Sequence, residues 1–426
     1  FDCDAFHALA NRYKVAVVLS GDSAHPRLDC PAPDFVYARV MGTSATVFGL
    51  ASVAMAVVGW LLSRRILHWM GTPENALDLA EAYLQVIFLA IPLLYLFAFV
   101  QAVLRGAGDS RTPFLFLTLV VALDTALNPL FIFGWGPVPA LGITGSAVAT
   151  FVANAVSLAA LLLWLRHRRH PLWIGRGERA LFRPDLALVR TLVTKGLPMG
   201  VQMVMISMAM IMMISMVNAY GVAMASAYGA ALQLWTYVQM PAMAIGAACS
   251  TMAAQNVGAG LWQRVDATAR AGVLCNLLLT GAMVGVMLLA DRHVLGWFLP
   301  DGSPALENAR HLNRIAIGSF IFFGVTFVLS GVVRSTGAVV PPLIILAVAM
   351  WGIRVPVARW LQPLWGADAI WWSFPISAVC AALMSLAYYV WGSWRSARML
   401  PAQQPCVGCP AEVGGQPPAA VAAAVT

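Results

Sequence analysis

Ten long apolar runs, separated by turn residues and charges, constrain the fold of this chain more than any other feature. A run of about 20 apolar residues is long enough to cross the hydrocarbon core of a bilayer. Because no water is present there to satisfy backbone N–H and C=O groups, each run is predicted to form a helix. The predicted membrane spans cover roughly residues 41–62, 83–104, 114–133, 143–165, 197–220, 224–252, 272–290, 315–333, 339–357 and 370–391.

The composition excludes an ordinary water-soluble protein. Of the 426 residues, 60% are hydrophobic and 10% are charged, whereas a soluble domain carries about 25% charged residues. The formal net charge of +8 comes from residues between the apolar runs and not from one basic domain, so we expect no nucleic-acid partner. The chain is therefore predicted to be an all-α polytopic membrane protein in contact with the lipid bilayer.

The positive charges between the runs predict the orientation in the membrane. If the segment 166–195 lies in the cytoplasm, the loops on that side hold fifteen Lys and Arg residues and the opposite loops hold seven, Arg354 among them. Cytoplasmic loops usually carry the excess of Lys and Arg. We therefore expect a multi-pass protein of the inner (plasma) membrane with a cytoplasmic C-terminus.

An internal repeat predicts two related halves. The letters RGAG at 105–108 match RSTG at 334–337, with a proline five residues beyond each, at an offset of 229 residues. The segments 64–69 and 292–297 match at an offset of 228 residues. Internal repeats of this kind are common in transporters. The sequence therefore predicts two pseudo-symmetric six-helix bundles, with chance similarity among apolar residues as the alternative.

The offset also predicts where the bundles begin and end. Counted back by the offset, the partners of the runs 197–220 and 224–252 fall before residue 1 or on residues 1–24, which are too polar to span a membrane. The first bundle is therefore expected to lack two N-terminal helices; a ten-helix design is the alternative. The predicted divisions are a non-helical or aberrant stretch (1–38), a four-helix bundle (39–165), a cytoplasmic linker (166–195), a six-helix bundle (196–395) and a disordered cytoplasmic tail (396–426).

Several motifs resemble those of the multidrug and toxic compound extrusion (MATE) family of antiporters. They are LRGAGDSRTP at 104–113, ALNPLFIFG at 126–134, GITGSAVAT at 142–150, AQNVGAG at 254–260 and RVP at 354–356. The loop residues that carry the resemblance are Arg105, Gly106, Gly108, Asp109, Pro113, Gln255, Asn256 and Gly258. The glycines permit tight turns where helices leave the membrane. We expect Asp109 to form a local ion pair with Arg111, and Gln255 and Asn256 to cap a helix end.

A single carboxylate lies near the middle of an apolar run. Asp124 is followed one helical turn later by Asn128, so both side chains face the same way. A charge at the bilayer centre costs about 2.5–3.5 kcal/mol or more, and a carboxylate retained there suits a group that binds a proton or a sodium ion. Asp124 and Asn128 are therefore predicted to couple transport to a cation. A structural hydrogen bond to a neighbouring helix is the alternative.

Polar, aromatic and methionine side chains on several runs are predicted to line a substrate cavity. Thr150 and Asn154 are candidate hydrogen-bond partners for Asp124. Methionine suits surfaces that accept varied partners, and aromatic rings attract organic cations; packing within the bundle is the alternative role. The predicted cavity residues are Tyr95, Gln101, Thr150, Asn154, Met205, Met212, Tyr228, Trp235 and Tyr237.

The resemblance implies a secondary active antiporter that works by alternating access. It would export amphipathic, often cationic, organic compounds in exchange for protons or sodium, as a monomer and without a cofactor, metal or catalytic group. Two departures matter: the family order of Asn and Asp is exchanged at 124 and 128, and the runs 197–220 and 315–333 contain no acid. The alternatives are a flippase for lipid-linked oligosaccharides and a non-functional transporter fragment.

Overall fold

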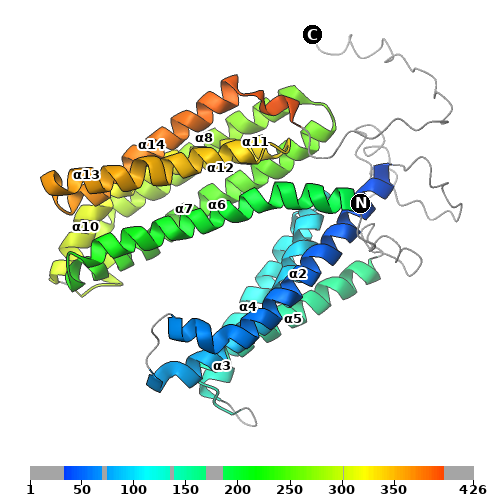
Figure 1. Cartoon of the computed structure of the whole chain (residues 1–426), viewed down its shortest axis with the longest axis horizontal. Helices are drawn as coiled ribbons and strands as arrows, with labels where there is room; N and C mark the ends of the chain where they lie inside the picture. Colours follow the sequence, from blue (N-terminus) through cyan, green and yellow to red (C-terminus); the bar gives the residue numbers. More distant parts are fainter. Residues whose placement is uncertain (1–32, 70–73, 135–138, 169–185, 301, 398–426) are drawn as a thin grey trace, which may run out of the picture.

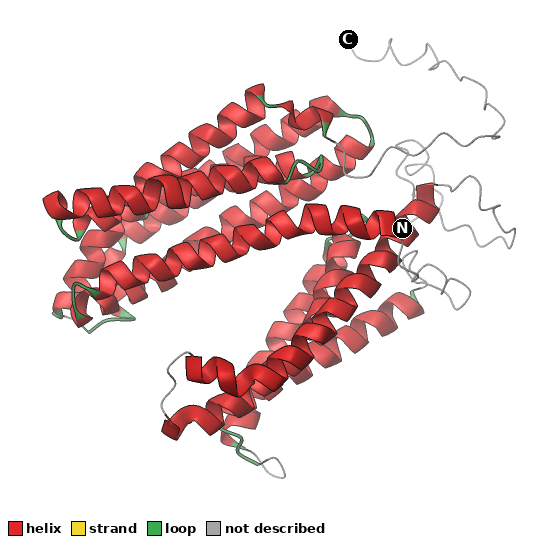
Figure 2. Cartoon of the chain, in the orientation of Figure 1, coloured by secondary structure: helices red, strands yellow, loops and turns green. Residues whose placement is uncertain are grey.

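The computed structural model describes residues 33–69, 74–134, 139–168, 186–300 and 302–397, and all regular structure in these ranges is helical (Figures 1 and 2). The first bundle contains α2 (Pro33–Trp69), α3 (Glu74–Gly106), α4 (Arg111–Phe133) and α5 (Ile143–His167). The second contains α6 (Leu186–Asn218), α7 (Val222–Gly258), α8 (Trp262–Leu289), α9 (Asp291–Gly296), α10 (Pro304–Ala316), α11 (Ser319–Arg334), α12 (Val340–Ala347), η2 (Val348–Arg354), α13 (Val355–Trp365), α14 (Asp368–Trp391) and η3 (Ser393–Ser396). The predicted all-α architecture is confirmed.

Each predicted apolar run forms a helix, and most of these helices have the length and composition of a membrane span. Eight described helices qualify when α12, η2 and α13 are taken as one, and α10 with α11, which are bent by 47°, make a ninth. The remaining helix, α7, has 37 residues but is not among those apolar enough to qualify, because it is rich in Ala, Gly, Ser, Thr and Gln. The ten runs are thus confirmed as helices, but only eight or nine are apolar spans.

The helix ends differ from the predicted divisions at two places. α2 begins at Pro33, so the expected start of the first bundle at residue 39 lies inside a helix. α5 ends at His167 and α6 begins at Leu186, so helices extend into both ends of the expected linker 166–195. The remainder of the predicted N-terminal stretch and nearly all of the predicted tail lie outside the described residues.

The duplication is visible in the positions where helices begin. The starts of α2 and α8, of α3 and α10, and of α4 and α12 are 229, 230 and 229 residues apart. The turns after α3 and α11 also match, because Gly108 and Gly337 have φ of 92° and 93°, a region that favours glycine. Their backbone N–H groups bond the carbonyls of Arg105 and Arg334 at 3.0 and 2.9 Å. The described part of the first bundle holds no counterparts of α6 and α7.

Small residues let the helices of each bundle approach closely. In the second bundle α7 and α11 pack against each other, and a Cβ atom at Gly331 would lie 2.6 Å from the carbonyl oxygen of Gly246. Lipid tails are as apolar as the side chains, so no hydrophobic force drives helices together in a bilayer. Close packing of small residues drives their association instead. These two glycines therefore fix the distance between α7 and α11, which both contribute to the cavity described below.

The two bundles touch at one end of the molecule and diverge toward the other (Figure 1). Contacts between bundles join α2 with α6 and α3 with α7. At the end of α3, the amide of Gln255 on α7 donates a hydrogen bond to the carbonyl oxygen of Gly106 at 3.3 Å. The loops 107–110 and 259–261, which carry the matched motifs, lie at this closed end.

Candidate substrate pocket and coupling site

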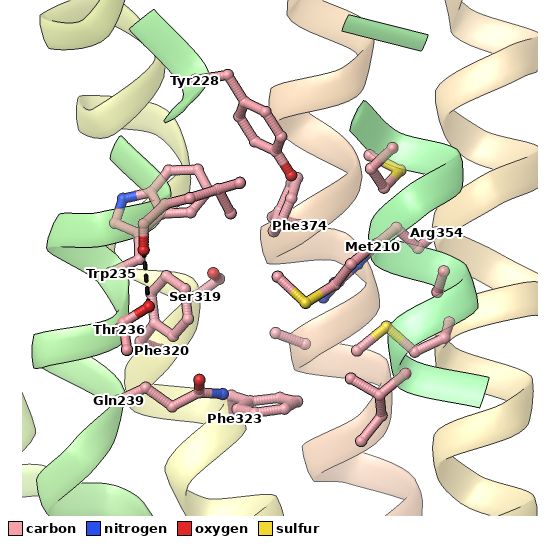
Figure 3. A pocket seen from close by; sticks show the side chains of 16 residues that line it. Met210, Tyr228, Trp235, Thr236, Gln239, Ser319, Phe320, Phe323, Arg354 and Phe374 are labelled. Atoms are coloured by element: carbon pink, nitrogen blue, oxygen red, sulfur yellow. Dashed lines mark hydrogen bonds between the residues drawn. The ribbon is translucent and has the colours of Figure 1, made fainter. Parts of the chain in front are cut away.

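A cavity of about 710 Å³, counted with its open mouth, lies inside the second bundle (Figure 3). Helices α6, α7, α11 and α14 and the π-helix η2 all contribute side chains to it. α7 carries one wall, and Met210 and Arg354 lie across the cavity from Trp235. The lining residues are Ile206, Ala209, Met210, Met213, Tyr228, Leu232, Trp235, Thr236, Gln239, Ser319, Phe320, Phe323, Met350, Arg354, Phe374 and Ala378.

Arg354 reaches this cavity because the helix that carries it is widened just before a proline. Pro356 has no N–H to donate, and the backbone N–H of Val355 bonds the carbonyl of Met350 five residues earlier, which is the π-helical pattern. The Arg354 Nε donates to the Ser377 hydroxyl at 2.9 Å. Its guanidinium carbon lies 4.4 Å from the centre of the Phe374 ring.

The sequence-based assignment of Arg354 to an outer loop was therefore wrong. The continuous helix formed by α12, η2 and α13 runs through Pro356 to Trp365. Arg354 therefore lies in the middle of a span and not at its end. Among the described residues that line the cavity it is the only charged side chain. The RVP motif was the available signal, because a proline inside a helix lacks a backbone donor and can accompany a local π-turn.

The aromatic side chains of the cavity are held in fixed positions by one another. Tyr228 and Trp235 meet edge to face at 6.0 Å between ring centres, and Trp235 lies 5.3 Å from Phe374. The Trp235 Nε1 donates to Asn313 Oδ1 at 2.9 Å, which satisfies its buried polar group. The prediction that Tyr228 and Trp235 belong to a cavity agrees with their place in this wall.

Two polar groups on the cavity wall have no hydrogen-bond partner among the described residues. Tyr228 is only 3% exposed, and Figure 3 shows its hydroxyl directed toward the cavity near Phe374. Gln239 contributes an amide from the same helix at the other end of the cavity. Buried polar groups normally find a partner, so the Tyr228 hydroxyl in particular is available to a bound molecule; the half-buried Gln239 amide can also donate or accept.

Other predicted cavity residues lie outside this pocket. Tyr237 is 45% exposed and accepts a hydrogen bond from Gln233 on the outer face of α7. The turn of α6 that faces the cavity carries Met210 and Met213, whereas Met205 and Met212 on the same helix are not among the residues that line it. The spacing of the methionines could not distinguish these faces, because methionine occurs all round α6.

In the first bundle the predicted coupling residues form a separate polar cluster. The Thr150 hydroxyl on α5 donates to Asp124 Oδ1 at 2.9 Å, as expected. Asn128 donates to the Asp124 backbone carbonyl at 2.9 Å, so it binds the backbone of that residue and not its carboxylate. Asn154 donates to the Thr150 carbonyl at 2.8 Å and not to Asp124.

Tyr95 and Gln101 on α3 lie apart from both sites. The Tyr95 hydroxyl donates to the Ser44 carbonyl at 3.3 Å, and its ring stacks on Phe99. Gln101 is buried, with its Oε1 bonded by Arg105 and its Nε2 without a partner among the described residues. Neither lines the cavity of the second bundle, so their predicted role in substrate binding stays a prediction.

The residues of the motif loops make hydrogen bonds to the backbone at the closed end. Asp109 accepts the backbone N–H groups of Arg111 and Thr112, each at 3.0 Å, so it caps α4; no ion pair joins it to Arg111 in the described structure, contrary to expectation. Gln255 bridges the bundles and does not cap its own helix. Asn256 does bond its own helix, at the Met252 carbonyl.

The family model described as MatE matches residues 37–130 and 198–360, more than half of the chain. The chain belongs to the MatE family. Among curated members of similar sequence, the "Probable multidrug resistance protein YoeA" of Bacillus subtilis is 34% identical over 85% of this chain and 79% of that protein. The "Probable multidrug resistance protein NorM" of Thermotoga maritima is 25% identical over 75% of this chain and 68% of that protein.

Solved structures of MATE transporters share the fold. The Vibrio cholerae MATE transporter VcmN in its bent form superimposes with a TM-score of 0.74 at 17% identity and covers 85% of this chain and 83% of that one. A MATE structure described as outward-facing gives a TM-score of 0.76 at 18% identity, covering 85% and 82%. Membership of the MatE family, together with the apolar helices, makes this chain a multi-pass transmembrane transporter and not an enzyme.

Proposed function

We propose that this MatE chain is a secondary active transporter that exports amphipathic organic compounds, cations among them, in exchange for protons or sodium. The observation that most supports this proposal is the carboxylate of Asp124, which Thr150 holds within a span. The molecule that contains it has two bundles that touch at one end. Relatives are named as multidrug resistance and multidrug export proteins. The proposed transporting unit is a monomer in the plasma membrane.

In this proposal Asp124 binds the coupling cation. A ligand shifts a conformational equilibrium only by binding the two states unequally. A carboxylate in a span is poorly tolerated as a bare charge, so its occupancy by a proton or sodium ion depends on how much water each state admits. Thr150 keeps one carboxylate oxygen oriented, and the second oxygen is left for the cation.

The touching of the bundles supports alternating access. At the closed end Arg105, Arg111 and Arg264 flank the loops, and Lys and Arg gather on the cytoplasmic side of membrane proteins. We infer that this form is closed toward the cytoplasm and that the C-terminus is cytoplasmic. Opening that end would require the Gln255–Gly106 contact to break.

The test is ethidium efflux from cells that lack their own major pumps. Asp124→Asn keeps the size and the hydrogen bond from Thr150 but cannot take up the cation, so efflux should fall at least about tenfold and lose its response to an imposed proton or sodium gradient. Asp78→Asn is the matched control, because the Asp78 side chain is 89% exposed.

Each outcome separates the alternatives. Full, gradient-dependent efflux in the Asp124→Asn variant would remove Asp124 from the coupling role. If the unaltered chain exports no ethidium but changes the turnover of lipid-linked oligosaccharides, the flippase function replaces drug export. A chain that inserts but does neither would support a non-functional fragment.

A further inference from the structure

We infer that the cavity of the second bundle binds the acidic group of aromatic compounds, with Arg354 as the residue that holds the carboxylate. The inference rests on the proposed transport function and adds aromatic carboxylates to a substrate range expected to be cationic. The structural basis is a positive charge, an aromatic wall and an unpartnered hydroxyl that line one cavity.

The charge of Arg354 is not compensated by an acid. No carboxylate of a described residue lines the cavity or pairs with the guanidinium, whose contacts are the Ser377 hydroxyl and the face of Phe374. An unpaired charge removed from water is unfavourable, and attraction between opposite charges strengthens in a low-dielectric site. A ligand carboxylate would therefore be bound strongly here, and an ammonium group would be repelled.

The guanidinium is also held in a geometry that suits a carboxylate. Its Nε is occupied by Ser377 at 2.9 Å, while no hydrogen bond from its two terminal nitrogens reaches a described residue. Arginine presents its N–H groups as a planar fork that matches two carboxylate oxygens. Stacking on Phe374 fixes the plane of that fork.

The remaining walls of the cavity suit a ligand with an aromatic ring. Trp235, Phe320 and Phe323 line the space around Arg354, and rings of this kind prefer to pack edge to face or offset against another ring. A small hydrated anion would leave these apolar walls uncovered, whereas an aryl carboxylate would cover them.

Tyr228 supplies a second recognition group. Its hydroxyl lies on the wall facing Phe374, has no partner among the described residues and points toward the cavity. A hydroxyl can donate to a carboxylate oxygen while the ring keeps its contact with Trp235 at 6.0 Å. Tyr228 and Arg354 thus place one neutral and one charged donor on the wall of the same cavity.

The experiment measures binding to the purified full chain in detergent by calorimetry, with 2-naphthoate and 2-naphthylmethylammonium as probes of equal ring and opposite charge. We expect 2-naphthoate to bind at least about tenfold more tightly. Arg354→Gln should weaken 2-naphthoate binding about 10- to 100-fold, the range for a lost charged hydrogen bond. Arg359→Gln is the matched control, since Arg359 is exposed on α13, which continues the helix that carries Arg354, and lies outside the cavity.

Two further variants keep the test valid if Arg354→Gln does not fold. Arg354→Lys retains the charge and should recover part of the affinity. Tyr228→Phe removes only the hydroxyl and should weaken 2-naphthoate about 2- to 10-fold without strengthening the ammonium probe. Equal affinity for both probes, or unchanged 2-naphthoate binding in Arg354→Lys and Tyr228→Phe, would overturn the inference.

The binding result and the transport result are independent. No ion gradient is needed for calorimetry, so Arg354-dependent binding without ethidium efflux would support the site and contradict the transport proposal. Ethidium efflux together with charge-independent probe binding would leave the transporter intact and reject the anion site.

Discussion

Charged residues in this protein differ in how completely the fold pairs them. Arg354 has a hydroxyl and a ring as partners, as described above. Asp291, at the start of α9, is the opposite case: its Oδ2 lies 3.3 Å from Arg310 and 3.1 Å from Arg314, and its side chain is 7% exposed. The first arrangement leaves a positive charge for a ligand, and the second satisfies its charge internally.

Asp291 therefore should stabilise the loop between α8 and α10. Asp291→Asn would leave Arg310 and Arg314 without their shared anion and should lower stability by roughly 1–3 kcal/mol at neutral pH, the range for hydrogen bonds to charged groups. The measurement is the thermal unfolding midpoint in detergent. Asp78→Asn, at an exposed site, should leave the midpoint unchanged; an equal effect of both variants would contradict this role.

The same residue predicts a pH dependence. Burial raises the pKa of the Asp291 carboxyl, but hydrogen bonds from the Arg310 side chain and the Arg292 backbone, with the charges of Arg310 and Arg314, outweigh it and hold the pKa below its ordinary value. A lowered pKa gives stability that is fully present above the unfolded value of about 4 and is lost as the pH falls through the folded value. The difference in midpoint between the unaltered chain and Asp291→Asn should therefore shrink as the pH is lowered from about 5 to about 3. A difference that grows in this range would reverse the sign of the pKa shift.

At the scale of elements, close crossings depend on single glycines. A Cβ atom at Gly145 on α5 would lie 2.3 Å from the backbone carbonyl oxygen of Phe131 on α4, and a backbone atom cannot move aside as a side chain can. This crossing holds the helix that carries Asp124 against the helix that carries Thr150. The packing of α4 on α5 is thus a condition for the polar cluster of the first bundle.

Gly145→Ala is expected to destabilise the first bundle by about 1–3 kcal/mol, the usual effect of overpacking. Gly229→Ala is the matched control, because a Cβ atom there meets nothing within 4 Å and alanine favours a helix by about 1 kcal/mol over glycine. Thermal unfolding of the two variants in detergent should shift in opposite directions or leave Gly229→Ala unchanged. A neutral Gly145→Ala would mean that α4 moves freely.

Sequence patterns predicted the elements better than their interruptions. Apolar length is enough to predict a helix in lipid, so all ten runs were found. The bend between α10 and α11 lies at Ile317 and Gly318, where the single glycine is a weak signal because isolated glycines are also tolerated inside helices. The π-turn before Pro356 depends on hydrogen bonds across one helix, and the direction of each α6 methionine depends on its neighbours; neither is contained in local composition.

At the scale of the whole molecule, few direct contacts hold the closed end together. The Gln255–Gly106 hydrogen bond is exposed, and exposed bonds of this kind contribute about 0.5–1.5 kcal/mol. A difference of this size changes a two-state equilibrium by roughly 2- to 12-fold. Loss of this bond alone would therefore shift the closed end by that factor, with the packing of α2 on α6 and of α3 on α7 still in place.

Gln255→Ala should shift the population toward separation of the bundles at this end by that factor. Asn256→Ala is the matched control, since the Asn256 amide bonds its own helix. Spin labels at the exposed positions Ala102 on α3 and Met252 on α7 would report the shift as a longer distance by pulsed electron resonance. An unchanged distance distribution in Gln255→Ala would show that other contacts set the equilibrium.

The duplication was predictable from sequence because a glycine with positive φ and a proline occur at the same spacing in both halves. These positions match although most apolar residues around them differ. The position of the cavity was not. It depends on five elements that meet inside the second half, and its key charge stood at what looked like the end of a run.

The direction of the two halves has a mechanical consequence. α2 and α8 begin at the same end of the molecule (Figure 1), so the copies run parallel and their symmetry axis follows the membrane normal. In carriers with inverted halves, swapping the shapes of the halves turns an outward form into an inward one. Here, exchanging the shapes of the two parallel halves leaves the open side on the same face of the membrane. The shape of one state therefore does not give the shape of the other. Under the proposed alternating access, a second state would need a new tilt between the halves, or a new bend at the prolines inside α3, α6 and α7.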